Sequence, residues 1–421
     1  MGTPTISQNP ALQSGKAQGH SIARTLAISL AFAWISIFNA VLDNGLPVIL
    51  TAPLEEGGLA LNFTAKGVVM AIDNILGLFL LPLFGWLSDK SKSKLGKRTP
   101  YIIAGGVLAA VLWAGTGLAL GLHVKWLFLI LLTGALASIA FSRPASLALL
   151  PDFTAIPHRR TANAITQIVS IVCTVVGLLV IMLFTQWGYD KIFYVTSVLM
   201  AVLIVLFLFT VKERRWQPPE QTPAADEVEA GHAQSKNRAF LLASLFFFYV
   251  AYNGLVSSLP NYAKEVLGLG AGKIVLPMAL TLAAAMLFAA PAAKLAQKFR
   301  RKPLLLLGVG LMIAAFATAS LQPALNLAMY ASFALTGGGF SVALVNLYPF
   351  MLELSDATKI GSATGIFNTV MTLAMVITPI ASGWLSDRFG LWTLFPYCIA
   401  ALGLSFLAIL LISKEKKVRH A

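Results

Sequence analysis

The chain has 421 residues, of which 57% are hydrophobic and 11% are charged, and its formal net charge is +14. Soluble proteins carry about 25% charged residues, so this composition and the mean hydropathy of +0.79 exclude an ordinary soluble domain. Apolar runs of about 20 residues can cross a bilayer as helices, whereas the alternating strands of a membrane barrel are not evident. We therefore expect an all-α membrane protein.

Polar segments divide the chain into two halves. Residues 1–23 predict a flexible cytoplasmic tail, residues 212–238 a cytoplasmic linker rich in Pro, Glu and Gln, and residues 413–421 a second tail. The apolar segments of the first half cover 25–50, 66–87, 100–122, 126–150, 161–185 and 190–211. Those of the second half cover 239–260, 274–296, 303–321, 324–350, 360–385 and 392–412. The sequence therefore predicts twelve transmembrane helices in two six-helix bundles, at 24–211 and 239–412.

The basic residues indicate the orientation of these helices. Most of the 31 Lys and Arg residues fall in the two tails and in the even-numbered loops. Because cytoplasmic loops carry the excess of bases, we expect both termini in the cytoplasm. The positive charge then reflects topology and contact with the lipid bilayer, and no basic face with interleaved aromatics supports nucleic-acid binding. We expect a multi-pass protein of the plasma membrane, specifically a bacterial inner membrane.

The pentapeptide GWLSD occurs twice, at residues 85–89 and 383–387, and a base follows each copy. The first copy ends the second span on the predicted cytoplasmic side, whereas the second copy ends the eleventh span on the opposite side. The two copies are therefore not equivalent positions. The counterpart of GWLSDKSKSKLGKRTP in the second half is AAKLAQKFRRKP, in which Gln297 replaces the aspartate. We interpret the second GWLSD as a helix-ending turn.

The segment GWLSDKSKSKLGKR resembles the loop signature of the major facilitator superfamily, G-x-x-x-D-[RK] followed by Gly and bases, between the second and third helices. The segments MAIDNILG, FSRPASLALLPDFT, RRTANAI and NLYPFMLEL resemble its glycoside-pentoside-hexuronide-like branch, which contains sucrose and other glycoside–proton symporters. The resemblance implies the major facilitator fold and alternating access. The implied gating motif comprises Gly85, Asp89, Lys90, Gly96, Lys97, Arg98, Asp152 and Arg160.

The same resemblance implies that Asp89 approaches the cytoplasmic start of the eleventh span, around Gly361, when the carrier faces outward. We accordingly expect Asp89→Asn to impair transport far more than Asp387→Asn. Melibiose-type cation symporters carry paired aspartates on the second helix, next to a proline. This chain has only Asp73, with Pro82 farther along, which argues against sodium coupling of that kind.

Three charged residues are interpreted as lying inside predicted spans: Asp43, Asp73 and Arg143. A carboxylate at mid-membrane costs roughly 2.5–3.5 kcal/mol on insertion scales, so Asp73 needs a compensating role. It is predicted to load and release the coupling proton; the alternative is a structural carboxylate bonded to neighbouring helices. Arg143, interpreted as the only base inside a span, is expected to pair with Asp73 or with Asp89, or to extend toward the inner interface.

Polar side chains at mid-span depth are the candidates for substrate binding. Gly45 and Pro47 follow Asp43 and free backbone groups that can line a cavity, although a hydrated outer vestibule is the alternative for this stretch. Amides suit sugar hydroxyls because each amide both donates and accepts. The predicted substrate-binding residues are Asn39, Asp43, Asn44, Asn74, Gln167, Tyr252, Asn253 and Asn346.

The histidines and cysteines suggest no chemistry. The five histidines are dispersed in tails and loops, and the two cysteines lie in apolar runs, so we expect no metal site, no cofactor and no enzyme activity. A membrane-embedded enzyme and a channel are the rival classes, but the six-plus-six pattern suits a carrier. We expect proton-coupled uptake of a sugar or glycoside by a monomer. The alternatives are export of an organic ion or small apolar compound, and facilitated diffusion.

Overall fold

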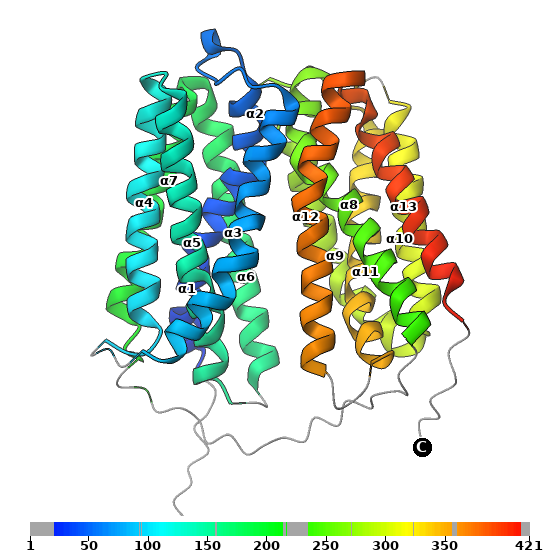
Figure 1. Cartoon of the computed structure of the whole chain (residues 1–421), viewed down its shortest axis with the longest axis horizontal. Helices are drawn as coiled ribbons and strands as arrows, with labels where there is room; N and C mark the ends of the chain where they lie inside the picture. Colours follow the sequence, from blue (N-terminus) through cyan, green and yellow to red (C-terminus); the bar gives the residue numbers. More distant parts are fainter. Residues whose placement is uncertain are drawn as a thin grey trace, which may run out of the picture.

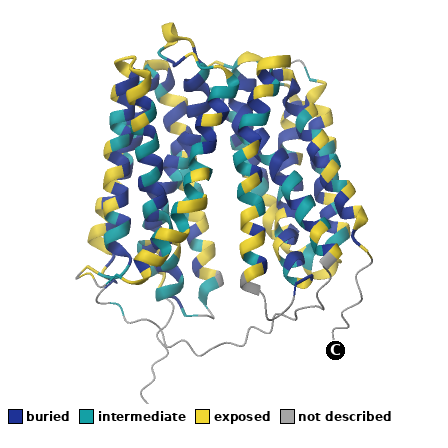
Figure 2. Ribbon diagram, viewed as in Figure 1, coloured by how far each residue is buried: buried dark blue, intermediate teal, exposed yellow. Residues whose placement is uncertain are grey.

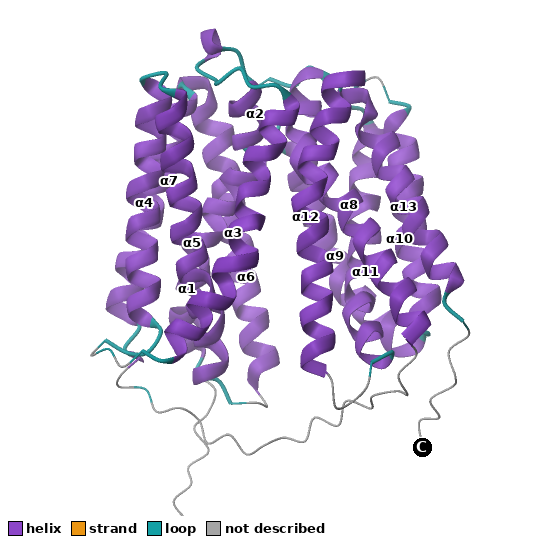
Figure 3. Cartoon of the chain, in the orientation of Figure 1, coloured by secondary structure: helices purple, strands orange, loops and turns teal. Residues whose placement is uncertain are grey.

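The computed structural model describes residues 21–91, 93, 95–155, 158–213, 216, 235–270, 272–322, 324–355 and 360–413. The predicted tails, apart from a few residues next to the helices, and most of the predicted linker lie outside this range. Every regular element in the described part is helical (Figure 3). Of these helices, 12 are long and apolar enough to cross a membrane, when the adjoining α1 and α2 are taken as one. The all-α prediction is confirmed.

The helix bounds follow the predicted spans within a few residues. The first half contains α1 (Ile22–Asn44), α2 (Leu46–Thr51), α3 (Phe63–Asp89), α4 (Thr99–Gly121), α5 (Lys125–Phe153), α6 (Arg159–Phe184) and α7 (Tyr189–Thr210). The second half contains α8 (Ser235–Glu265), α9 (Leu276–Lys298), α10 (Arg301–Ser320), α11 (Leu327–Glu353), α12 (Ile360–Phe389) and α13 (Leu394–Leu411). Short 3-10 turns cover Leu54–Glu56, Thr185–Trp187 and Leu391–Thr393.

The helices form two groups that stand side by side, blue to green for the first half and green to red for the second (Figure 1). We call the end at which α3 finishes and α4 begins the predicted cytoplasmic end, and the opposite end the predicted outer end. Each group has its own aromatic core. Phe38 packs on Trp113 with ring centroids 4.4 Å apart, and Phe316 packs on Phe395 at 5.9 Å.

The periphery of both groups carries large exposed apolar side chains, among them Phe79, Trp126, Phe209 and Leu287. Figure 2 shows buried residues inside each group and exposed ones along its faces. A water-soluble protein would hide such a surface, whereas hydrocarbon solvates it. The pattern is that of a protein whose outer surface contacts lipid.

The two groups meet most closely along α3 and α12, near the predicted outer end. A Cβ atom on Gly67 would lie 2.0 Å from the carbonyl oxygen of Pro379, and one on Gly383 would lie 2.2 Å from that of Phe63. Only glycine permits these backbones to come so close. Toward the predicted cytoplasmic end, the ribbons of α3 and α12 move apart (Figure 1).

Candidate functional site

A charged cluster lies between α1, α3 and α5 of the first bundle. Arg143 Nη1 on α5 is 4.0 Å from Asp73 Oδ2 on α3, and Arg143 Nη2 donates a 3.2 Å hydrogen bond to Asn39 Oδ1 on α1. One turn after Asn39, Asp43 interacts electrostatically with both Asp73 and Arg143. Of the two partners expected for Arg143, the structure therefore selects Asp73 and places Asp89 elsewhere.

The geometry of this cluster leaves its charges loosely paired. Two carboxylates face one guanidinium, and the Asp73–Arg143 distance is at the outer limit of an ion pair. The side chains of Arg143 and Asp73 are 26% and 20% exposed, so solvent or a ligand can reach them. A carboxylate held this way can change its partner, because no bidentate contact fixes it.

The second bundle presents aromatic rings to this cluster. Tyr252 on α8 is half-buried and interacts electrostatically with Asp43 on α1. Its ring stacks on Phe340 of α11 with centroids 4.3 Å apart, and Tyr249 meets it edge-on. Polar groups of the first bundle and an aromatic surface of the second thus flank the same region. The structure brings together Asn39, Asp43, Asp73, Arg143 and Tyr252.

Other predicted binding residues lie apart from this cluster. Asn346 is fully buried in the second bundle, where it accepts from Arg301 at 3.2 Å and donates to the carbonyl of Val342. Gln167 is exposed on α6, and Asn253 is buried on α8. Substrate contact is still only a prediction for these three residues, and Asn346 is already engaged by neighbours within its own bundle.

The remaining two predicted amides, Asn44 and Asn74, donate hydrogen bonds to backbone carbonyls of helices. Asn44 is buried at the end of α1 and donates 3.0 Å to the carbonyl of Ala40, so it closes the last turn before Gly45. Asn74 on α3 donates 3.4 Å to the carbonyl of Met375 on α12. The second contact joins the two bundles one residue after Asp73, which places the charged cluster beside the α3–α12 crossing.

The predicted gating motif forms a network centred on Arg98 at the predicted cytoplasmic end. Arg98 contacts Asp89 at 2.6 Å, Asp152 at 3.0 Å and Ser88 Oγ at 2.6 Å, while Lys97 lies 3.6 Å from Asp89. Burial alone would lower the pKa of Arg98, but the hydrogen bonds and charges of Asp152 and Asp89 outweigh burial and raise this pKa. Arg98 thus stays charged, and Asp89 is held within its own bundle.

Glu213 completes this network, although the sequence placed it in the linker. Its carboxylate accepts hydrogen bonds of 2.7–3.0 Å from the backbone N–H groups of Lys97, Arg98 and Thr99, and so caps the start of α4. Gly96 has φ +123°, and a Cβ there would lie 2.3 Å from the Glu213 carboxylate, which explains the glycine. The signal in the sequence that could have identified this role is that Glu213 is an acid close after the sixth predicted span, with basic residues on both sides.

The other motif residues lie nearby. Lys90 Nζ sits 3.7 Å from the ring centroid of Trp86, and Gly85 faces Pro144 of α5. The side chain of Arg160 lies outside the described part of the chain. In the second half, Arg301 pairs with Glu353 at 3.0 Å, which repeats the Arg98–Asp152 pair without an acid equivalent to Asp89.

The second GWLSD copy makes a contact that sequence reasoning missed. Asp387, at the end of α12, accepts 2.8 Å hydrogen bonds from the backbone N–H groups of Phe63 and Thr64, and a further bond from the Thr64 hydroxyl. These donors belong to the first turn of α3, in the other bundle. This copy does end α12 at Phe389, as interpreted, but its carboxylate also joins the bundles.

Lys66 strengthens the same contact from within. It is the first residue of the second predicted span, where the interpretation of Arg143 as the only base inside a span left it out. It lies in α3 with 0% exposure and donates to the carbonyl of Ser257 at 3.1 Å and to Asn261 at 3.4 Å. Asn261 in turn donates to the carbonyl of Pro47 and to Thr51. Arg143 is therefore not the only base inside a span. The signal was a lysine only four residues beyond Asn62, a strong helix N-cap.

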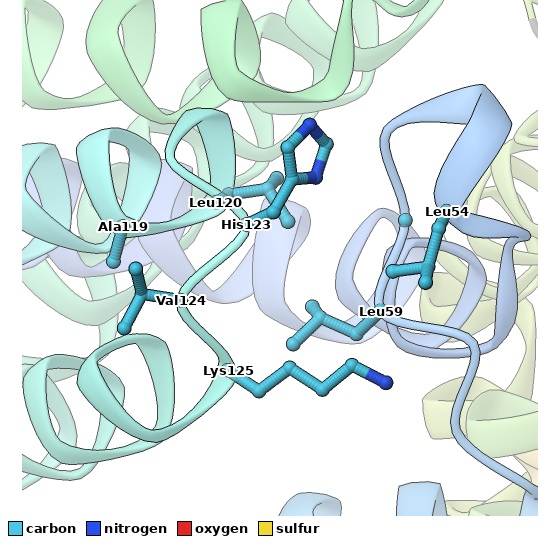
Figure 4. A pocket seen from close by; sticks show the side chains of 8 residues that line it. Leu54, Leu59, Ala119, Leu120, His123, Val124 and Lys125 are labelled. Carbon is cyan, nitrogen blue, oxygen red and sulfur yellow. The ribbon is translucent and has the colours of Figure 1, made fainter.

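A small hollow lies apart from these groups at the predicted outer end. It is lined by Leu54, Gly58, Leu59, Ala119, Leu120, His123, Val124 and Lys125 (Figure 4). Its lining is mainly apolar and belongs to one bundle, so it offers few groups for recognition. Among the described residues no three His, Cys, Asp or Glu side chains gather as a metal site would require.

Comparisons with known proteins agree with this architecture. The chain is 26% identical over 267 residues to "Multidrug resistance protein MdtL" of Salmonella heidelberg (strain SL476). The aligned region covers 61% of this chain and 64% of that protein. The match thus spans less than two thirds of the relative. A bacterial homologue of the human lysosomal transporter Spinster, in an inward-facing and occupied conformation, superimposes with a TM-score of 0.67 at 14% identity, covering 92% and 94% of the two chains.

Two further solved structures share the fold. The nucleoside transporter NupG gives a TM-score of 0.66 at 14% identity, covering 92% of this chain and 99% of that one. A POT family transporter in complex with 5-aminolevulinic acid gives 0.72 at 11% identity, covering 92% and 95%. The model of the family described as Major Facilitator Superfamily matches residues 28–379 and 274–421. The chain therefore belongs to the Major Facilitator Superfamily.

Proposed function

We propose that this transporter moves a small molecule by alternating access and couples the movement to a proton carried by Asp73. The observation behind the proposal is the cluster of Asp73, Asp43, Arg143 and Asn39 beside the α3–α12 crossing. Uncompensated charge is costly inside a membrane, so a cluster with two acids and one base is suited to taking up a further positive charge. A proton on Asp73 would supply it.

The coupling would act through Arg143. With Asp73 ionised, the guanidinium is drawn toward α3; with Asp73 protonated, that attraction is lost and Arg143 can turn to Asp43 or to a bound ligand. The change takes place next to Asn74, whose side chain bonds to α12. Protonation would thereby alter the contact between the bundles, which is what a coupled carrier requires.

The direction of access is supported by where the bundles touch. Hydrogen bonds that Asp387 accepts and that Lys66 and Asn261 donate join them at the predicted outer end, while α3 and α12 move apart toward the other end (Figure 1). We assign this arrangement to the state that faces the cytoplasm. One chain contributes every group of the cluster, so we propose a functional monomer in a plasma membrane, the bacterial inner membrane being the expected one.

For the substrate we propose a sugar or glycoside taken up with the proton. The stacked rings of Tyr252 and Phe340 offer an apolar face for a pyranose, and Asn39 offers an amide for its hydroxyls. This part of the proposal rests on the motif resemblance to glycoside–proton symporters. The gating motif and the Arg143–Asp73 pair do not depend on it.

A second candidate is export of an organic cation in exchange for protons. Two carboxylates against one guanidinium, faced by aromatic rings, would also suit a positively charged planar compound. The similarity to a multidrug resistance protein favours this alternative. In both versions Asp73 carries the coupling.

Transport by purified protein in liposomes tests the proposal. With an inward proton gradient, we expect accumulation of sucrose, maltose or a related glycoside; accumulation of an aromatic cation against a proton gradient would favour the exporter. Asp73→Asn should abolish gradient-driven accumulation but retain counterflow, whereas Asp190→Asn, which removes a carboxylate paired with Lys191 at 2.8 Å, should change neither. Accumulation by Asp73→Asn equal to that of the unaltered protein would refute the assignment of the proton to Asp73.

A further inference from the structure

The carboxylate of Asp387 lies at the end of α12, where the second bundle contacts the first turn of α3 in the first bundle. We propose that Asp387 is a latch that holds the predicted outer ends of the two bundles together, so that the second GWLSD copy is a gating element in its own right. The proposal rests on the proposed alternating access, because a latch has a role only where the bundles separate.

The first argument is the chemistry of the contact. The first N–H groups of a helix have no partner within the helix, and the N-terminus carries a partial positive charge that favours an anion. Asp387 accepts from two of these groups, of Phe63 and Thr64, at 2.8 Å each. The Thr64 hydroxyl adds a third bond. Charge-assisted bonds of this kind are about twice as strong as neutral ones, and all three must break when α3 leaves α12.

The second argument is that the surrounding backbone is shaped for this contact. Gly383 precedes Asp387 by one helical turn, and a Cβ on Gly383 would lie 2.2 Å from the carbonyl oxygen of Phe63. The missing side chain therefore lets the end of α12 reach the start of α3. Gly67 permits the same approach one turn farther along, against Pro379. Side-chain bonds from Lys66 to α8 and from Asn261 to Thr51 close the same end.

The third argument is the relation between the two GWLSD copies. Helices α3 and α12 run in opposite directions through the membrane, and each ends on GWLSD followed by a base. Asp387 is the last acid of α12 and caps α3, whereas Asp89 is the last residue of α3 and is held by Arg98 and Lys97 of its own bundle. The two carboxylates occupy corresponding places at opposite ends of one helix pair. Asp387 is engaged across the bundles in the state in which Asp89 is not.

The test measures the positions of the bundles rather than transport. Spin labels are placed, with the two native cysteines replaced, at exposed positions on different bundles: Leu122 with Leu321 at the predicted outer end, and Leu95 with Phe299 at the other. Dipolar distance distributions are recorded for the unaltered sequence, Asp387→Asn, Thr64→Val and the control Asp190→Asn. Thr64→Val deletes one bond of the latch and keeps the aspartate, so it remains informative if Asp387→Asn folds poorly.

We expect Asp387→Asn to raise the ratio of outer-open to outer-closed molecules about tenfold, which corresponds to about 1.4 kcal/mol. Thr64→Val should shift the ratio in the same direction by less, and Asp190→Asn should leave both distance distributions unchanged. Distributions for Asp387→Asn and Thr64→Val that match the unaltered sequence would overturn the latch. Because no substrate or proton gradient is needed, the latch can fail while proton-coupled transport stands, and transport by Asp73 can fail while the latch stands.

Discussion

Replacing Gly67 by alanine adds one methyl group to the crossing of α3 and α12. That Cβ atom would lie 2.0 Å from the carbonyl oxygen of Pro379, whereas ordinary contacts begin at 3.4 Å, so the two backbones must separate by about 1.4 Å or distort. Overpacking of this kind costs about 1–3 kcal/mol. The cost falls only on molecules whose outer end is closed, so the conformational ratio should move roughly 5- to 150-fold toward the outer-open state.

Dipolar distances between labels at Leu122 and Leu321 measure this shift directly, and initial rates of accumulation should fall with it. Gly77→Ala is the matched control, because it lies on the same helix and its Cβ would meet only Leu81 at an ordinary 3.7 Å. Alanine in a helix is favoured over glycine by about 1 kcal/mol, so the control should be neutral or stabilising. Equal behaviour of Gly67→Ala and Gly77→Ala would refute the close crossing.

Three other substitutions test separate parts of the structure. Glu213→Gln should lower the apparent melting temperature in detergent, by an amount corresponding to roughly 1–3 kcal/mol, because a neutral amide satisfies the α4 terminus less well; unchanged melting would argue against the cap. Asn261→Ala should lengthen the outer label distances, since it removes both bonds to Pro47 and Thr51; an unaltered distribution would contradict that. Arg143→Lys should reduce gradient-driven accumulation by about tenfold or more, because an ammonium cannot replace a guanidinium that reaches Asp73 and Asn39 together; rates equal to the unaltered protein would count against the cluster.

Much of the architecture could be predicted because hydropathy is a local property. A helix in hydrocarbon must satisfy its own backbone, so each apolar run of sufficient length identifies a span without reference to its neighbours. The gating motif was equally accessible, since Asp89 and Arg98 are separated by only a few residues and meet across one loop. The charged cluster was recognised from the cost of burying Asp73 and Arg143.

The sequence indicates that these charged residues are buried, but it does not identify the residues with which they interact. Sequence reasoning left Arg143 with two candidate aspartates, because the choice depends on how α3 and α5 are rotated about their axes. It overlooked Lys66 because a base near the end of an apolar run is ordinarily exposed. Lys66 is fully buried where its ammonium group meets Ser257 and Asn261 of α8, and no periodicity in the sequence encodes those partners.

The two GWLSD copies show how position changes the meaning of the same letters. Both place an aspartate in the last turn of a helix, where the helix dipole disfavours a negative charge, so both carboxylates require compensation from elsewhere. Asp89 obtains it from Arg98 and Lys97, which follow it in sequence. Asp387 has only one base beside it before α12 ends, and it obtains compensation from the start of α3, more than 300 residues away. A motif search finds the first arrangement because its partners are local, whereas the second becomes visible only when both bundles are assembled.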